Sequence, residues 1–199
     1  MIKDKITPEL RQRFIQEISK TMTDGDEHGF LICKDNDGDL SPSIATNGSK
    51  YHINFSDIKS QCPFKIQGDF HTHASVEDMR NFIKDNKDQL PEEVNISDSL
   101  IRDMTIKLYK ENGISTTTPS HGDLLGVLVL KSKGKIDGTV CMSSDAEPRK
   151  IECWTTKDNI VQEDHYTRAS IEIKDDKLVR NPPHNWIKPL FHKETINLR

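Results

Sequence analysis

Two histidines separated by one residue are the side chains in this sequence best suited to bind a metal ion. They end the segment Gly68-Asp-Phe-His-Thr-His73, which has the composition of a strand. Side chains alternate between the two faces of a strand, so His71 and His73 are expected to point the same way. That spacing suits two imidazole ligands on one zinc ion. Two surface histidines on an edge strand are the alternative interpretation of this pair alone.

A second motif, Ser120-x-x-Asp123, has the pattern of a helix capping box. The serine would begin the helix, and the acid at the third position would reach back to it. A structural interpretation and a functional one are compatible here, because residues fixed at a helix start are held rigidly enough to serve a metal site. Glu27 precedes an apolar strand, where a lone glutamate is usually a solvated turn residue.

The order of these residues resembles the signature of the JAMM (JAB/MPN) zinc metalloproteases in its prokaryotic form. Glu27-His-Gly-Phe-Leu, Gly68-Asp-Phe-His-Thr-His73 and Pro119-Ser-His-Gly-Asp-Leu124 each resemble one of the three parts of that signature. The resemblance extends from about residue 5 to about residue 155. It implies a JAB/MPN-like fold, which is a cytidine-deaminase-like three-layer arrangement.

The resemblance also implies a role for each residue. His71, His73 and Asp123 would be the three protein ligands of one zinc ion per chain, with a fourth position left for water. Glu27 would act as the general base that takes a proton from this water and passes it to the leaving amine. Ser120 would donate a hydrogen bond to the tetrahedral oxyanion. The expected enzyme is a zinc metallopeptidase that removes ubiquitin-like modifiers from proteins.

One departure from the family pattern is large. The family usually joins its His-x-His motif to its Ser-x-x-Asp motif by a short loop, whereas here the segment 74–118 lies between them. This segment is rich in charged residues and has helical patterning, so it is expected to be an insertion beside the metal. A lid, a substrate-docking element and an oligomer contact are the functions considered for it, against a solvated excursion with no role.

Two other functions compete with the metallopeptidase. The first is an MPN-like scaffold that keeps the fold without the chemistry, although such members typically lose ligands and all five positions are filled here. The second is a PHP-type metal phosphoesterase, whose first strand also carries Asp-hydrophobic-His-x-His. That class needs a later Asp-x-His and further ligands, and no Asp-x-His occurs in residues 74–199.

The elements that must position these residues follow from local patterns. A helix is expected over 7–22, with Thr7 as its N-cap and with an apolar stripe formed by Leu10, Phe14, Ile18 and Met22. Strands are expected over 27–33, 52–55, 65–73, 139–142, 150–155 and 170–173. Two short helices, separated at Pro91, are expected within 74–118. His28 is expected to point away from Glu27, toward solvent or a partner.

Together these elements predict one α+β domain over 1–175, with a curved, mostly antiparallel sheet flanked by helices and with the helical insertion 74–118. Residues 176–199 are expected to form a C-terminal arm, since prolines extend the chain there.

Composition narrows the partners and the compartment. Only 33% of the 199 residues are hydrophobic and 30% are charged, which favours one modest core with a solvated insertion. The net charge of -4 disfavours nucleic acid, and no segment has the apolar length of a membrane span. Four scattered cysteines indicate a cytoplasmic protein with free thiols. A Cys141–Cys153 bridge across neighbouring strands is the alternative.

Overall fold

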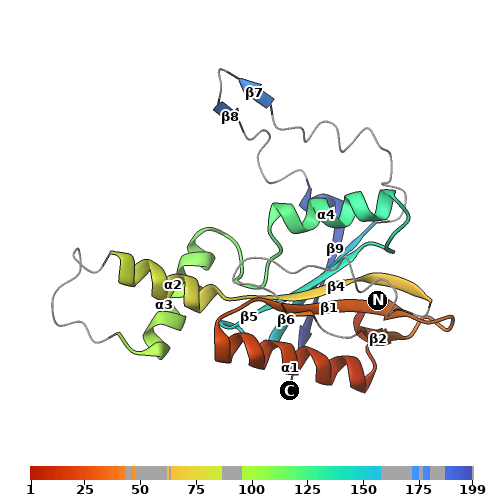
Figure 1. Ribbon diagram of the computed structural model, residues 1–199, viewed down its shortest axis with the longest axis horizontal. Helices are drawn as coiled ribbons and strands as arrows, with labels where there is room; N and C mark the ends of the chain where they lie inside the picture. The colour runs from red at the N-terminus through yellow and green to blue at the C-terminus, as the bar shows by residue number, and fades with distance from the viewer. Residues whose placement is uncertain are drawn as a thin grey trace.

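The computed structural model describes residues 1–43, 46–47, 62, 64–86, 96–157, 172–174, 177–179 and 187–198. An open mixed sheet lies at the centre of the protein, with the strand order β2-β1-β4-β5-β6-β9 and with β3 also paired to β1 (Figure 1). Only β4 and β5 pair in parallel; the other neighbours in this sheet are antiparallel. The expected α+β class, with a mostly antiparallel sheet flanked by helices, is confirmed. The strands of this sheet are β1 (His28–Lys34), β2 (Leu40–Pro42), β3 (Thr46–Asn47), β4 (Lys65–His73), β5 (Thr139–Ser144), β6 (Lys150–Thr156) and β9 (Phe191–Asn197).

Helix α1 (Pro8–Asp24) begins where the sequence predicts. The Thr7 hydroxyl accepts the backbone N–H of Leu10 at 3.2 Å. The expected stripe needs one correction, because Met22 is 48% exposed and Thr21 is buried in its place. A strict four-residue spacing drifts around a helix of 3.6 residues per turn, by about 120° between residues 10 and 22. Residue 21 returns to the buried line.

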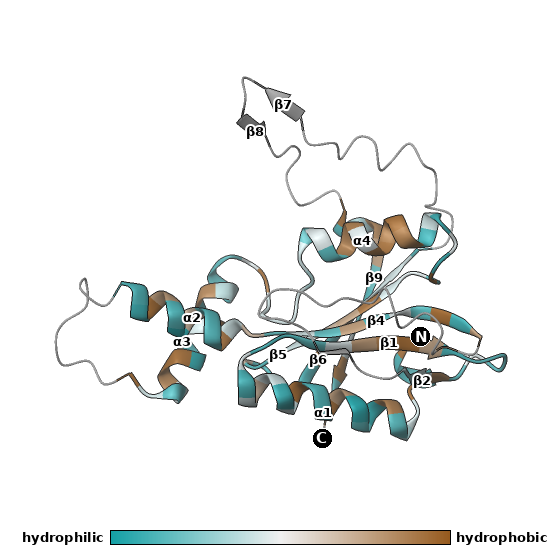
Figure 2. Cartoon of the chain, in the orientation of Figure 1, coloured by the Kyte–Doolittle hydropathy of each residue, from teal (hydrophilic) through white to brown (hydrophobic). Residues whose placement is uncertain are grey.

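Helices α1 and α4 (His121–Ser132) lie on opposite faces of the sheet, and each covers its own apolar core (Figure 1). On the α1 side, the rings of Phe14, Phe30 and Phe70 pack with centroids 4.7 to 5.6 Å apart. On the α4 side, Leu124 and Leu128 pack against the strands. Figure 2 shows the resulting hydrophobic character of β1 and α4. The alternation of strand residues decides which core each one enters.

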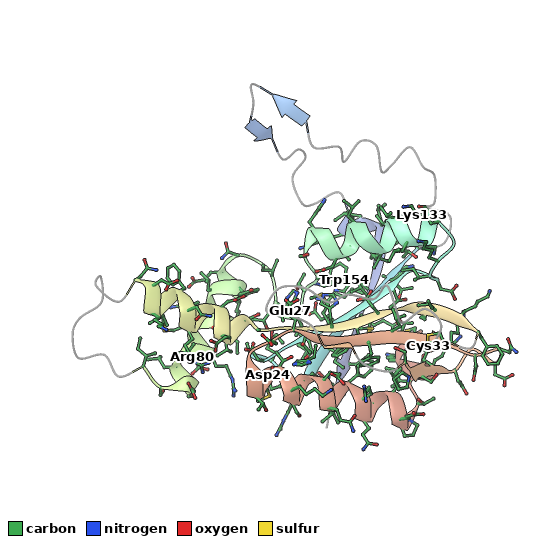
Figure 3. All side chains as sticks on the ribbon, viewed as in Figure 1. Asp24, Glu27, Cys33, Arg80, Lys133 and Trp154 are labelled. Atoms are coloured by element: carbon green, nitrogen blue, oxygen red, sulfur yellow. A yellow bond between two sulfur atoms is a disulfide. The ribbon has the colours of Figure 1, made fainter. Side chains whose placement is uncertain are left out.

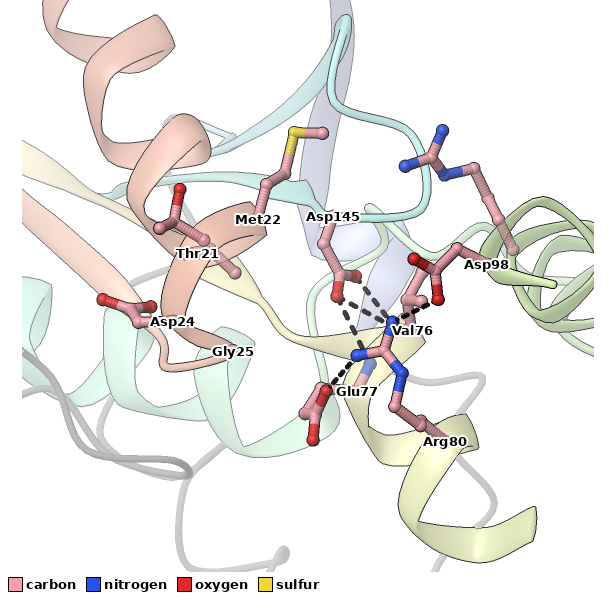
Figure 4. Close-up of a pocket in the computed structure, with 11 residues that line it drawn as sticks. Thr21, Met22, Asp24, Gly25, Val76, Glu77, Arg80, Asp98 and Asp145 are labelled. Atoms are coloured by element: carbon pink, nitrogen blue, oxygen red, sulfur yellow. Dashed lines mark hydrogen bonds and ion pairs between the residues drawn. The ribbon is translucent and has the colours of Figure 1, made fainter. Parts of the chain in front are cut away.

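The insertion contains the two expected helices, α2 (Ser75–Asp85) and α3 (Asp98–Glu111); Pro91 lies outside the described residues. Its two ends are tied to the chain that leaves β5. The backbone N–H of Val76 donates to Asp145, at 3.0 Å from Oδ1 and 3.1 Å from Oδ2, and the backbone N–H of Glu77 donates to Oδ2 at 3.4 Å (Figure 4). Asp145 therefore caps α2, beside a pocket of about 200 Å³ between the end of α1 and the start of α2.

The other end of the insertion is anchored by Glu147. Its carboxylate accepts hydrogen bonds from the hydroxyl groups of Ser115 at 2.8 Å and Thr116 at 2.6 Å. Within the insertion, Arg80 joins α2 to the start of α3 through Glu77 and Asp98 (Figure 4). These contacts fix the insertion beside the C-terminal end of β4, where His73 lies, because the backbone N–H of Asp145 donates to the His73 carbonyl at 3.1 Å.

The C-terminal segment contributes to the main sheet. Within the expected arm 176–199, strand β9 pairs antiparallel with β6 along its whole length, and Phe191 is buried in the α4-side core. The short strands β7 (Glu172–Lys174) and β8 (Lys177–Val179) pair only with each other. The expected strand 52–55 lies outside the described residues. Single-turn 3-10 helices are η1 (Lys3–Lys5) and η4 (Lys188–Leu190).

The expectation of free cysteines is wrong, since the structure pairs all four. Cys141 and Cys153 face each other across the antiparallel β5–β6 pair and form a disulfide, as the alternative interpretation had it. Cys33 and Cys62 form the second disulfide. Cross-strand neighbours with Cα atoms a few ångströms apart are close enough for a bridge, whatever their separation in sequence. In the described part of the chain, no helix has the length and apolar character needed to cross a membrane.

Candidate metal centre

Three predicted ligands converge on the α4 side of the sheet. Phe70 and Thr72 of β4 point toward α1, so the alternation places His71 and His73 on the opposite face. Helix α4 begins there and brings Asp123 to them. The ligand atoms of these three residues all lie within 4.8 Å of one another, and His71 Nε2 is 3.5 Å from Asp123 Oδ1. Two imidazoles and one carboxylate fit the three protein ligands of a catalytic zinc site.

The start of α4 holds Asp123 in place through the predicted capping box. The backbone N–H of Ser120 donates to Asp123 Oδ2 at 2.7 Å, and the backbone N–H of Asp123 donates to Ser120 Oγ at 3.2 Å. One carboxylate oxygen therefore fixes the helix end while the other, Oδ1, faces His71. Asp123 can therefore cap the helix and serve as a metal ligand at the same time.

Asp69 is a residue of the site that the sequence interpretation missed. Its Oδ2 lies 2.9 Å from His71 Nδ1, and its side chain precedes His71 by two residues on the same face of β4. A carboxylate at Nδ1 orients the ring and leaves Nε2 directed at the ligand position, as in many histidine metal sites. The signal was present in the sequence, because alternation puts residues 69, 71 and 73 in one row.

The electrostatics of the ligand set favour a positive charge among the carboxylates. Burial acts to lower the pKa of His71, but hydrogen bonds to Asp123 and Asp69 outweigh it and raise this pKa to about 10. Burial and the nearby His71 lower the pKa of His73 to about 4. Burial acts to raise the pKa of Asp123, yet contact with His71 holds it well below its usual range. A divalent cation supplies the same positive charge that these carboxylates stabilise.

Glu27 lies just before β1, beside this group. Gly29 pairs with His71 in the antiparallel β1–β4 ladder, so extending the register by two residues brings Glu27 opposite His73. Figure 3 labels Glu27 and Cys33 at opposite ends of β1. Burial raises the pKa of Glu27 to about 7, against the lowering effect of His71. His28 does not join the site: it is buried rather than solvent-facing, and its Nε2 is 2.8 Å from Asp24 Oδ2.

A cleft of about 580 Å³ opens beside the ligands. His73 and Ser120 line it together with Leu124 of α4, and the end of the insertion supplies another wall through Tyr109 and Ile114. This volume is in the range of about 300–1,000 Å³ typical of ligand pockets. The insertion thus borders the space next to the candidate metal centre.

Comparison with known proteins adds no relative. No protein-family model, no curated protein and no solved structure matches this chain. The site is therefore interpreted from its own geometry and chemistry.

Proposed function

We propose that this protein is a zinc-dependent hydrolase of amide bonds with a JAB/MPN-like fold. The observation that carries the proposal is the convergence of His71, His73 and Asp123 within 4.8 Å. Two further groups needed for hydrolysis lie beside these ligands: the partly buried carboxylate of Glu27 and the hydroxyl of Ser120 at the start of α4. The ordered resemblance to the JAMM signature is independent support, since it rests on motifs and not on distances.

The chain's own residues divide the chemistry in this proposal. A bound zinc ion supplies a Lewis acid that polarises the scissile carbonyl and makes water easier to deprotonate. Asp69 orients His71, and the capping box orients Asp123, so the ligands are held before substrate arrives. Glu27 accepts the proton of the attacking water and returns it to the leaving amine nitrogen. The amine then departs neutral as the carbon–nitrogen bond breaks.

Ser120 stabilises the oxyanion in this scheme. Its Oγ already accepts the Asp123 N–H at 3.2 Å, and this bond does not use the hydroxyl proton. The hydroxyl is exposed and lines the cleft, so its proton can be donated to a carbonyl oxygen there. A donor directed at developing negative charge is worth about 10²–10³ in kcat.

Following the motif resemblance, we propose peptide or isopeptide bonds after the C-terminal Gly-Gly of a ubiquitin-like modifier as substrates. The phosphoesterase alternative needs several more ligands. Among the described residues, His71, His73 and Asp123 form the one group of three or more ligand side chains close enough to hold a metal ion. The scaffold alternative predicts zinc binding without hydrolysis.

The test measures zinc content and cleavage on the same preparations of full chain. Substrates are an isopeptide-linked modifier conjugate and a mixed peptide library. Glu27→Gln should retain zinc and lose cleavage by at least about 10². His71→Ala should lose both, while His192→Ala, an exposed histidine on β9, should lose neither. Wild-type cleavage by Glu27→Gln, or stoichiometric zinc in His71→Ala, would reject the assignment.

A further inference from the structure

Among its described lining residues, the cleft beside the candidate metal centre has a basic side chain and no carboxylate. Its described lining contains no aspartate or glutamate, and its one lysine or arginine is Lys188 of η4. Lys188 is partly buried, and no carboxylate among the described residues forms an ion pair with it. By contrast, Lys150 and Lys193 nearby in the fold are both engaged by Glu152. An ammonium in a cleft whose described lining holds no carboxylate attracts a carboxylate from the ligand.

The remaining lining suits a polypeptide. Ile114, Leu124 and Ile187 offer an apolar surface for an aliphatic side chain. Asn112 donates through Nδ2 to the Leu108 carbonyl at 2.8 Å, which fixes its amide and leaves the carboxamide oxygen as an acceptor for a backbone N–H. The hydroxyl of Ser120 can donate to a backbone carbonyl.

The cleft is also preformed. Thr118, which lines it, donates to the buried carboxylate of Glu152 at 3.3 Å, and the preceding residues Ser115 and Thr116 are held by Glu147. The wall made by the end of the insertion is therefore tied to β6 and to the chain between β5 and β6. A fixed wall reduces the ordering cost of binding an extended segment.

We propose that this cleft binds the part of the substrate adjoining the scissile bond, and that it selects a peptide segment with an aliphatic side chain and a carboxylate placed at Lys188. The inference rests on the proposed hydrolase function for the position of the segment, because His73 and Ser120 line the same cleft. It adds a charge preference that the motif resemblance does not contain: an acidic segment is preferred over a basic one.

The test is equilibrium binding of two fluorescent octapeptides to the full chain, followed by anisotropy at low salt, with and without zinc. The peptides share their leucines and glycines and differ only in carrying two aspartates or two arginines. Wild-type protein should bind the acidic peptide about fivefold more tightly, and salt should weaken the difference. Lys188→Glu should invert the preference, and Lys188→Arg should keep it.

The matched control is Lys135→Glu, an exposed lysine just beyond the far end of α4, which should leave the preference unchanged. Equal binding of both peptides, tighter binding of the arginine peptide, no measurable binding of either, or an unchanged preference in Lys188→Glu would overturn the proposal. Cleavage is scored separately. A preserved charge preference without cleavage rejects the hydrolase function alone, and cleavage without a charge preference rejects the cleft assignment alone.

Discussion

Asp69 Oδ2 lies 2.9 Å from Nδ1 of His71, and both side chains come from the same face of β4. The contact fixes the proton on Nδ1 of His71, and a metal ion bound at Nε2, which faces Asp123, would take the place of the proton on that nitrogen. In metal sites such partners fix ring orientation and raise the basicity of the ligand. Asp69 is therefore assigned as a positioning residue of the proposed centre.

Asp69→Asn is expected to weaken zinc binding by about 10- to 100-fold, because the amide no longer provides the negative charge at Nδ1. Competition with a chromophoric chelator measures the affinity directly, with no need for turnover. Asp137→Asn is the matched control, since Asp137 also forms a 2.9 Å ion pair, with Lys34, and belongs to no part of the site. Equal zinc affinities for wild type and Asp69→Asn would remove Asp69 from the centre.

Ser120, the N-cap of α4, can be compared with Ser97, the N-cap of α3. Ser120 accepts the Asp123 N–H at 3.2 Å, and Ser97 accepts the Leu100 N–H at 3.3 Å in the same geometry. Replacing either by alanine should cost about 0.5–2 kcal/mol of unfolding free energy through loss of the N-cap. Only Ser120→Ala should also lower the cleavage rate, by about 10²–10³. If the two variants cleave equally well, Ser120 is a cap and nothing more.

Local sequence patterns were sufficient to predict much of the fold. The helix start at Thr7, the strand 65–73 and the capping box at Ser120 are each set by residues within a few positions of one another, and all were predicted. The pairing of Ser120-x-x-Asp123 with His-x-His was also predictable as one site, because the ordered motifs resemble a known signature. Asp69 could also have been assigned to the site, because the strand alternation that places the two histidines on one face places Asp69 there too.

What sequence could not provide depends on contacts between distant segments. Residues 191–197, within the expected arm, form strand β9 because they pair with the free edge of β6. Nothing local to residues 191–197 specifies that partner. The Cys141–Cys153 disulfide follows from the register of β5 and β6 and not from cysteine spacing. The insertion is anchored by Asp145 and Glu147, which look like ordinary turn residues until the fold brings them to its two ends.

The stability of the cleft wall should depend on pH through Glu152, whose side chain is 1% exposed. Burial acts to raise its pKa, but ion pairs with Lys193 at 2.9 Å and Lys150 at 3.1 Å lower it below the ordinary value of 4.5. A carboxylate with a lowered folded-state pKa contributes stability above its unfolded pKa and loses it as pH falls through the folded value. Wild-type protein should thus lose this contribution below about pH 4.5.

Glu152→Gln should cost about 1–3 kcal/mol at pH 7 and should flatten the decline in stability between pH 5 and 3. Urea denaturation at several pH values measures both effects. Glu111→Gln, which alters an exposed pair with Lys107, should follow the wild-type pH profile. A Glu152→Gln profile parallel to wild type would show that the buried carboxylate has no lowered pKa.

Replacement by alanine is expected to have opposite effects on stability at Gly68 and at Gly126. Gly68 pairs with Thr139 in the parallel β4–β5 ladder, and a Cβ at this position would collide with the backbone of Thr139, its carbonyl oxygen included. Backbone cannot give way as a flexible side chain can, so Gly68→Ala should cost about 1–3 kcal/mol. Because β4 also carries His71, the displaced strand should weaken zinc binding as well.

Gly126 lies in α4 with nothing within 4 Å of an added Cβ. Gly126→Ala should therefore raise the unfolding free energy by about 0.5–1 kcal/mol, through the better helix propensity of alanine, and should leave zinc affinity unchanged. Chemical denaturation and chelator competition on the two variants measure both quantities. If Gly68→Ala is as stable as wild type, β4 and β5 are not in the close parallel register on which the position of His71 and His73 relative to α4 depends.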